Sequence, residues 1–92
     1  MNTGTTTYNF GSSRGSITYS FPFWGKSLKQ LIIHYNPVNI PTGGYTIYFP
    51  SSFTYDPEVR NTSGGLVSIY TDRIKLEAMS GACTGWIIIT GF

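Results

Sequence analysis

Apolar side chains recur at every second position in several short stretches of this chain. Residues 16–21 and 74–78 alternate apolar residues with small or charged ones, and in residues 45–49 Thr46 and Tyr48 alternate with Tyr45, Ile47 and Phe49. This period of two is typical of a strand with one buried face. Residues 31–35 and 86–89 are instead mostly apolar and rich in isoleucine, which favours strands covered on both faces. No stretch is long enough to predict a helix with the 3.6-residue period.

Turn-forming residues lie between these segments and indicate where each strand ends. Pro22, Pro50 and the pair Asn36-Pro37 are expected to end strands, because proline has no backbone N–H to donate to a ladder. Residues 51–65 form the longest irregular stretch and end in a run rich in glycine and serine.

Three weaker segments complete the predicted set of strands. Residues 66–70 are expected to pair with residues 74–78 as a hairpin. Residues 58–60 fit a short strand, and residues 5–10 fit a strand at the edge of a sheet.

The chain is therefore expected to be all-β, a small antiparallel β-sandwich of the jelly-roll or immunoglobulin-like kind with six to eight short strands. Residues 1–15 are interpreted as an N-terminal arm or linker with a possible edge strand, and residues 16–92 as a single domain. The predicted core is made of apolar positions from these strands: Ile17, Tyr19, Phe21, Ile33, Ile47, Phe49, Phe53, Ile74, Leu76 and Ile88.

Composition narrows the range of functions. Of the 92 residues, 16% are aromatic and only 11% are charged, with a net charge of +2. The six basic residues are scattered, so they offer a nucleic acid little to bind. The longest apolar runs, residues 31–33 and 86–89, are far too short to cross a bilayer, and no membrane insertion is expected.

Few side chains of this sequence are suited to catalysis. His34 is the only histidine, and its place in an apolar strand favours an inert position in the core or at an interface. Cys83 is the only cysteine, and no cationic neighbour in the sequence activates it as a nucleophile. Asp56 and Glu58 have the spacing of a possible calcium site or carboxylate pair, but a solvated loop is the better interpretation. We therefore expect no enzyme activity, no metal and no cofactor.

Two blocks of the sequence resemble a known family. In the first block, residues 29–36 are followed by Ile-x-Phe-Pro-x-x-Phe at residues 47–53 and by Pro-x-Val at residues 57–59. The second block, residues 84–92, reads Thr-Gly-Trp-Ile-Ile-Ile-Thr-Gly-Phe. In order and spacing these blocks resemble the small C-terminal β-sandwich domains of bacteriophage tail fibres and receptor-binding proteins, including those similar to H-type lectins. The resemblance covers about residues 17–92.

Domains of that family usually form trimers and often recognise glycans on the host surface. The resemblance therefore implies a virion protein at the tip of a tail fibre or related appendage, which contacts other virion proteins and binds a host cell-surface glycan or protein. Two alternatives stay open. One is a purely structural trimerising or decoration protein without receptor affinity, and the other is a single-stranded nucleic-acid binder of the OB type.

Aromatic residues in excess of a small core's needs suggest where a ligand would bind. Tyr55, Asp56 and Arg60 lie in the long irregular stretch, where they offer a ring face, a hydrogen-bond acceptor and a donor. Trp24 lies in the turn after Pro22 and is a further candidate. These four residues are the predicted ligand contacts.

The last strand suggests how copies of the chain would assemble. Trp86, Ile87 and Ile89 belong to a run without a polar face, and so thin a domain cannot easily cover both sides of that strand. These three residues are therefore predicted to form an oligomer interface, with a trimer about a three-fold axis as the expected assembly. The alternative is that the strand is central in a closed monomeric sandwich.

Overall fold

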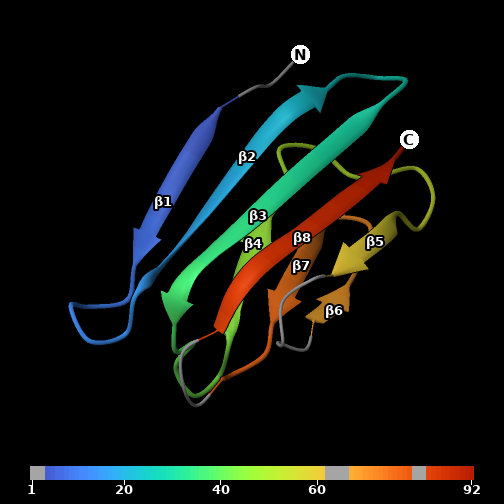
Figure 1. The fold of residues 1–92 in the computed structure, drawn as a ribbon. Helices are drawn as coiled ribbons and strands as arrows, with labels where there is room; N and C mark the ends of the chain where they lie inside the picture. Colours follow the sequence, from blue (N-terminus) through green and yellow to red (C-terminus); the bar gives the residue numbers. More distant parts are fainter. Residues whose placement is uncertain (1–3, 62–66, 80–82) are drawn as a thin grey trace.

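Two antiparallel sheets packed face to face make up the domain in a computed structural model, which describes residues 4–61, 67–79 and 83–92 (Figure 1). The strands, in chain order, are β1 (Thr5–Asn9), β2 (Ser16–Trp24), β3 (Lys29–Val38), β4 (Tyr45–Tyr48), β5 (Glu58–Asn61), β6 (Val67–Ile69), β7 (Arg73–Leu76) and β8 (Cys83–Gly91). One sheet has the order β1-β2-β3-β8-β5 and the other the order β4-β7-β6. The all-β sandwich expected from the sequence is confirmed.

All neighbouring strands in both sheets are antiparallel. The five-stranded sheet lies in front in Figure 1, with the three-stranded sheet behind it. Within the described ranges there is no helix, and hence none long and apolar enough to cross a membrane.

Two prolines lie inside strands that they were expected to end. Strand β2 continues through Pro22, with a register shift between Ser20 and Phe23. The ladder with β1 has already ended at Ser20, so the missing N–H of Pro22 costs no hydrogen bond on that side. Strand β3 continues through Pro37 in the same way, with an irregularity in its pairing with β8. A bulge thus accommodates each proline without ending the strand.

The core lies between the two sheets and is formed by the inward-facing residues of each strand. Leu31, Ile33 and Tyr35 of β3 are fully buried, and so are Ile74 and Leu76 of β7 on the opposite sheet. The predicted core is confirmed at Ile17, Ile33, Ile47, Phe49, Phe53, Ile74 and Leu76, while Tyr19 and Phe21 are partly buried against it.

The prediction that Ile88 belongs to the core is wrong. Ile87 and Ile89 are fully buried, and Ile88 between them is half-buried on the opposite side of the sheet. Successive side chains of a strand point to opposite faces of the sheet. Shifting the assignment of β8 by one residue therefore exchanges its buried side chains with its outward-facing ones. A run of identical residues gives no sign of which ones point inward.

Strand β1 is joined to the second sheet as well as to its neighbour β2. Tyr8 stacks on Tyr45 of β4, with ring centroids 4.8 Å apart. Phe10 packs edge-on against Tyr8 at 4.8 Å and against Tyr45 at 5.4 Å. The edge strand expected in residues 5–10 is therefore present, and aromatic contacts link it to the sheet behind it.

Ile87 and Ile88 provide a matched test of the sheet's orientation. Replacing Ile87 with alanine is expected to lower the free energy of unfolding by about 2–5 kcal/mol, because it leaves a cavity in the core. Ile88→Ala is expected to cost only about 1 kcal/mol, because that side chain lies on the outside. Urea denaturation of both variants measures the difference, and equal losses would contradict the assigned orientation.

Ionisation of Tyr45 is expected to lower the stability of the fold at alkaline pH. Partial burial, followed by a hydrogen bond with Tyr19, raises the pKa of Tyr45 from 10.0 to about 12. A raised pKa means that the folded state holds the Tyr45 proton more tightly than the unfolded state does. The neutral hydroxyl therefore contributes its full stabilisation to the fold below pH 10, and this stabilisation is lost as the pH rises through 12. Thermal melts between pH 9 and 12 should therefore fall less steeply for Tyr45→Phe than for the natural protein. Parallel curves for the two proteins would show that Tyr45 is not coupled to folding.

Candidate functional site

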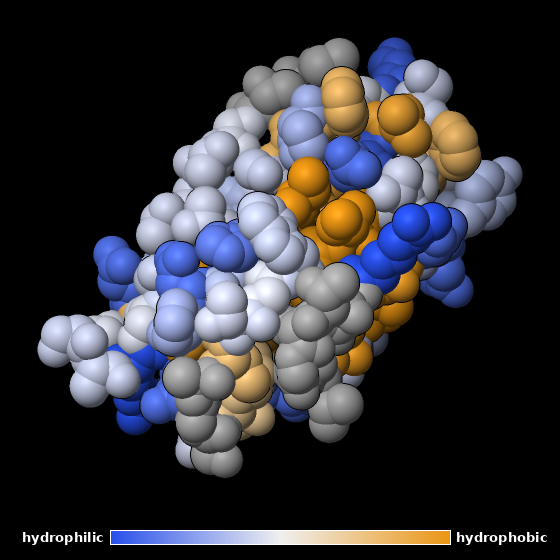
Figure 2. Space-filling view, viewed as in Figure 1, coloured by the Kyte–Doolittle hydropathy of each residue, from blue (hydrophilic) through white to orange (hydrophobic). Residues whose placement is uncertain are grey.

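The face of the five-stranded sheet that points away from the other sheet, which we call the outer face, carries a mixture of apolar and polar side chains. Across β3 and β8, three pairs lie opposite one another on it: Gln30 with Thr90, Ile32 with Ile88, and His34 with Trp86. Each pair forms a row of side chains that runs across the strands. Strand β5 extends two of these rows, with Glu58 opposite Thr90 and Arg60 opposite Ile88. Figure 2, viewed from the same side, shows hydrophobic surface bordered by strongly hydrophilic residues.

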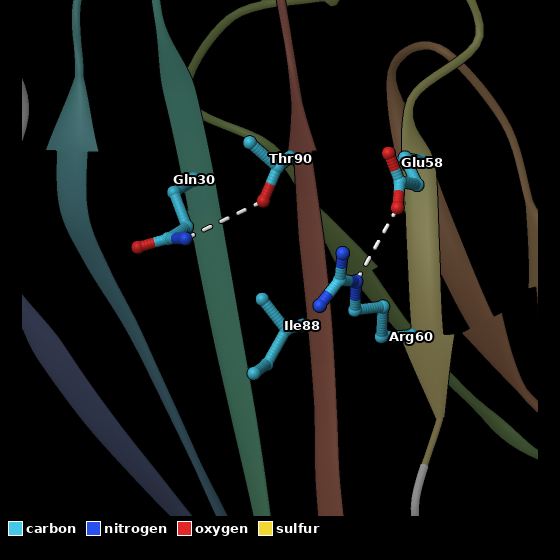
Figure 3. A pocket seen from close by; sticks show the side chains of 5 residues that line it. All are labelled: Gln30, Glu58, Arg60, Ile88 and Thr90. Carbon is cyan, nitrogen blue, oxygen red and sulfur yellow. Dashed lines mark hydrogen bonds and ion pairs between the residues drawn. The ribbon is translucent and has the colours of Figure 1, made fainter.

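A hollow of about 290 Å³ opens on this face and is lined by residues of β3, β8 and β5: Gln30, Glu58, Arg60, Ile88 and Thr90 (Figure 3). Ile88 is the apolar part of the lining, and the other four side chains are polar. Gln30 Nε2 donates a hydrogen bond to Thr90 Oγ1 at 3.4 Å, from β3 across to β8. The hollow thus combines one apolar surface with several hydrogen-bonding groups.

An ion pair borders the hollow on the side of β5. Arg60 Nε donates to Glu58 Oε1 at 3.3 Å, and the two side chains are 77% and 70% exposed. A pair so exposed adds little to stability, because water screens the attraction. The contact uses Arg60 Nε, and the two terminal nitrogens of Arg60 point from β5 toward β8 (Figure 3).

His34 and Trp86 form a stacked aromatic pair next to the hollow. Their rings stack with centroids 4.2 Å apart and an angle of 28° between the planes. Trp86 is 48% exposed and precedes Ile88 of the hollow by two residues on the same face. His34 was expected in the core or at an interface; it is half-buried on the outer face, with its ring against the indole.

A second exposed aromatic ring lies in the row of Gln30. Phe23 of β2 pairs with Gln30 and is 54% exposed. The outer face therefore presents aromatic rings in two of its rows, that of Gln30 and that of His34. The polar hollow is formed by residues of β3, β8 and β5.

Trp24 occupies a position different from the one expected. It is 2% exposed, and its indole Nε1 donates to Ser51 Oγ at 2.9 Å. Its ring lies against those of Phe49 and Phe53, at centroid distances of 5.7 and 5.2 Å. Trp24 therefore packs in the core and anchors the loop after β4, and it offers no surface for the ligand contact predicted from the sequence.

The other predicted ligand contacts do not form one cluster around the hollow. Arg60 lines it, but Tyr55 and Asp56 do not. Both are exposed residues of the loop between β4 and β5, and Tyr55 is 72% exposed. The structure thus places Arg60 on the outer face and leaves Tyr55 and Asp56 on the loop that precedes it.

The three residues predicted to form an oligomer interface do not share a face. Ile87 and Ile89 are fully buried in the core of the single chain, so they are not available to a second subunit. Trp86 points to the outer face. A subunit that covered this part of β8 would meet Trp86 and Ile88 instead.

Sequence reasoning missed Gln30 and Thr90, and it weighed Glu58 only as part of a calcium site or of a carboxylate pair. The alternation of residues 29–36 contained a usable signal, since burial of Leu31 and Ile33 implies that Gln30 points outward. The position of Glu58 next to β8 had no such signal, because that pairing joins distant parts of the chain. Among the described residues, no group of three or more histidine, cysteine, aspartate and glutamate side chains is placed to hold a metal ion.

Comparisons of the chain with protein-family models, with curated proteins and with solved structures found no match. The function is therefore inferred from the side chains of the outer face and from the motifs of the sequence.

Fluorescence quenching tests whether the outer face is open to solvent. Of the two tryptophans, Trp24 is buried and Trp86 is half-exposed, so acrylamide should quench Trp86 far more strongly. Replacing Trp86 with phenylalanine is expected to leave an emission that acrylamide scarcely reduces. If quenching of the natural protein is already weak, Trp86 is covered in solution by a second molecule.

Proposed function

We propose that this domain is a non-enzymatic bacteriophage virion module, at the tip of a tail fibre or related appendage, that binds a host cell-surface glycan or protein through its outer face. The observation that carries the proposal is the hollow between β3, β8 and β5, with a partly apolar lining and four polar side chains. Beside it lies the half-exposed indole of Trp86, stacked on His34. A sheet that presents such groups is suited to recognition, because its backbone is already ordered when the ligand binds.

The side chains around the hollow support binding in preference to catalysis. They offer hydrogen-bond donors and acceptors together with an apolar surface, which are the groups that orient a ligand. Glu58 is held in the ion pair with Arg60, and no histidine or cysteine lines the hollow.

Assembly into a trimer would increase the strength of attachment. A shallow site of this size gives weak binding for each copy, and several copies on one particle bind a cell surface much more tightly through avidity. The trimer is part of the proposal, on the strength of the resemblance to tail-fibre domains.

A purely structural trimerising or decoration protein is the second candidate. In favour of it are the exposed apolar side chains of Phe23 and Trp86 on the outer face, because a subunit interface commonly buries such aromatic rings. Shielding of Trp86 from acrylamide, together with failure to bind cells, would favour this candidate.

Cell adsorption tests the leading proposal. The double variant Gln30→Ala with Arg60→Ala is expected to lose about tenfold or more of its adsorption to a bacterial strain that the natural protein binds. The reason is that hydrogen bonds to a charged group contribute about 1.5–3 kcal/mol each, and about 1.4 kcal/mol corresponds to a factor of ten. Labelled protein and a panel of intact bacterial strains provide the measurement.

Tyr55→Ala is the matched control, because Tyr55 is exposed but does not line the hollow. It should adsorb as the natural protein does, and both variants should keep the natural melting temperature. Full adsorption by the double variant, or loss only in Tyr55→Ala, would move the binding site away from the outer face.

A further inference from the structure

We propose that the hollow binds one uncharged sugar ring through two neighbouring hydroxyl groups, and that the next sugar of the same chain rests on Trp86 where it stacks on His34. This inference rests on the proposed function, because it names the class of ligand for the same face. It favours a neutral glycan over an acidic glycan, a phosphate or a protein receptor.

The balance of charge around the hollow is the first reason. One cation, Arg60, and one anion, Glu58, line it, and the two are paired at 3.3 Å. A phosphate or carboxylate would gain from Arg60 but would be repelled by Glu58 at a similar distance. A neutral ligand meets no such opposition, so the paired charges select against an anion.

The pairing of donor and acceptor is the second reason. Glu58 uses Oε1 to accept the hydrogen bond from Arg60 Nε, which leaves a second carboxylate oxygen as an acceptor. The terminal nitrogens of Arg60 are donors that point toward β8 (Figure 3). A sugar hydroxyl both donates and accepts, so two adjacent hydroxyls fit a donor and an acceptor held side by side.

The apolar lining and the size of the hollow are the third reason. A sugar ring has an apolar side formed by its C–H groups, and Ile88 offers this side an apolar contact between Gln30 and Arg60. The volume of about 290 Å³ is at the lower limit of small-molecule pockets. It therefore suits one ring, and further sugars of a chain would lie on the surface outside it.

The position of Trp86 provides a place for the second sugar. Trp86 and Ile88 are two residues apart on the same face of β8, which corresponds to about 7 Å along the strand. The indole is 48% exposed, and its stacking on His34 holds the ring in a fixed orientation. A glycan running along β8 would then contact both the hollow and the indole of Trp86.

Titration with matched sugars tests the inference. The probes are glucose, galactose, mannose and N-acetylglucosamine, the disaccharides of these sugars, and the acidic counterparts glucuronic acid, galacturonic acid and glucose 6-phosphate. Binding to the natural protein is followed by isothermal titration calorimetry and by ligand-observed NMR. We expect at least one neutral sugar to bind, the acidic sugars of the panel to bind more weakly than it does, and the affinity for the neutral sugar to change little with salt.

Three variants separate the parts of the site. Arg60→Ala is expected to weaken binding of the neutral sugar about tenfold. Trp86→Ala is expected to lower the affinity for the disaccharide several-fold and to leave the affinity for the single sugar unchanged. Glu58→Gln removes the negative charge and is expected to lower the affinity for the neutral sugar. At a site that binds anions, the same substitution would raise the affinity.

The outcomes also distinguish this inference from the proposed function. Preference for the acidic sugars, with tighter binding by Glu58→Gln, would overturn the neutral class. If Arg60→Ala abolishes cell adsorption but no sugar of the panel binds, the proposed function stands and the inference falls. If the natural protein binds neither cells nor sugars, both fall.

Discussion

The register between β3 and β8 determines which side chains the domain buries and which it displays. The pairing of Ile33 with Ile87 and of Leu31 with Ile89 places four fully buried side chains at the centre of the core. The same pairing places Gln30, Ile32 and His34 on the outer face opposite their β8 partners. A shift by one residue would exchange the two sets. Burial of these four side chains therefore also fixes which side chains lie on the outer face, so the packing of the core positions the candidate site.

One end of the sandwich depends on a different kind of interaction, in which polar groups are buried with their partners. Lys29 is 6% exposed, and its Nζ donates to the backbone carbonyl of Ser52 at 2.6 Å and lies 5.8 Å from the centre of the Phe53 ring. Trp24 donates to Ser51 in the same loop. Burying a charge is costly without such compensation, so these two hydrogen bonds tie the loop to β2 and β3. The loop leads into β5, which carries Glu58 and Arg60.

Local patterns predicted the strands well, because alternation and turn residues act within a few positions of the chain. They failed where the outcome depends on distant partners. The orientation of residues 86–89 could not be deduced from the isoleucine run itself, and it follows only from the pairing with β3. Pro22 lies inside a strand because the ladder with β1 ends just before it. Glu58 joins Gln30 and Thr90, and Arg60 joins Ile32 and Ile88, through the pairing of β5 with β8, which brings together residues some thirty positions apart.

The outer face offers two kinds of surface, and they differ in what can cover them. Around Trp86 and Ile88 the surface is apolar, so either a second subunit or a ligand would gain by displacing water. Around Glu58 and Arg60 the side chains are 70% and 77% exposed, and covering them with a dry subunit interface would strip water from two charges at a large cost. Sugar hydroxyls replace the hydrogen bonds of that water, so a glycan avoids most of this cost. The charged end of the face is therefore better suited to a ligand than to a subunit, and a trimer that keeps this end open would present one such site on each chain.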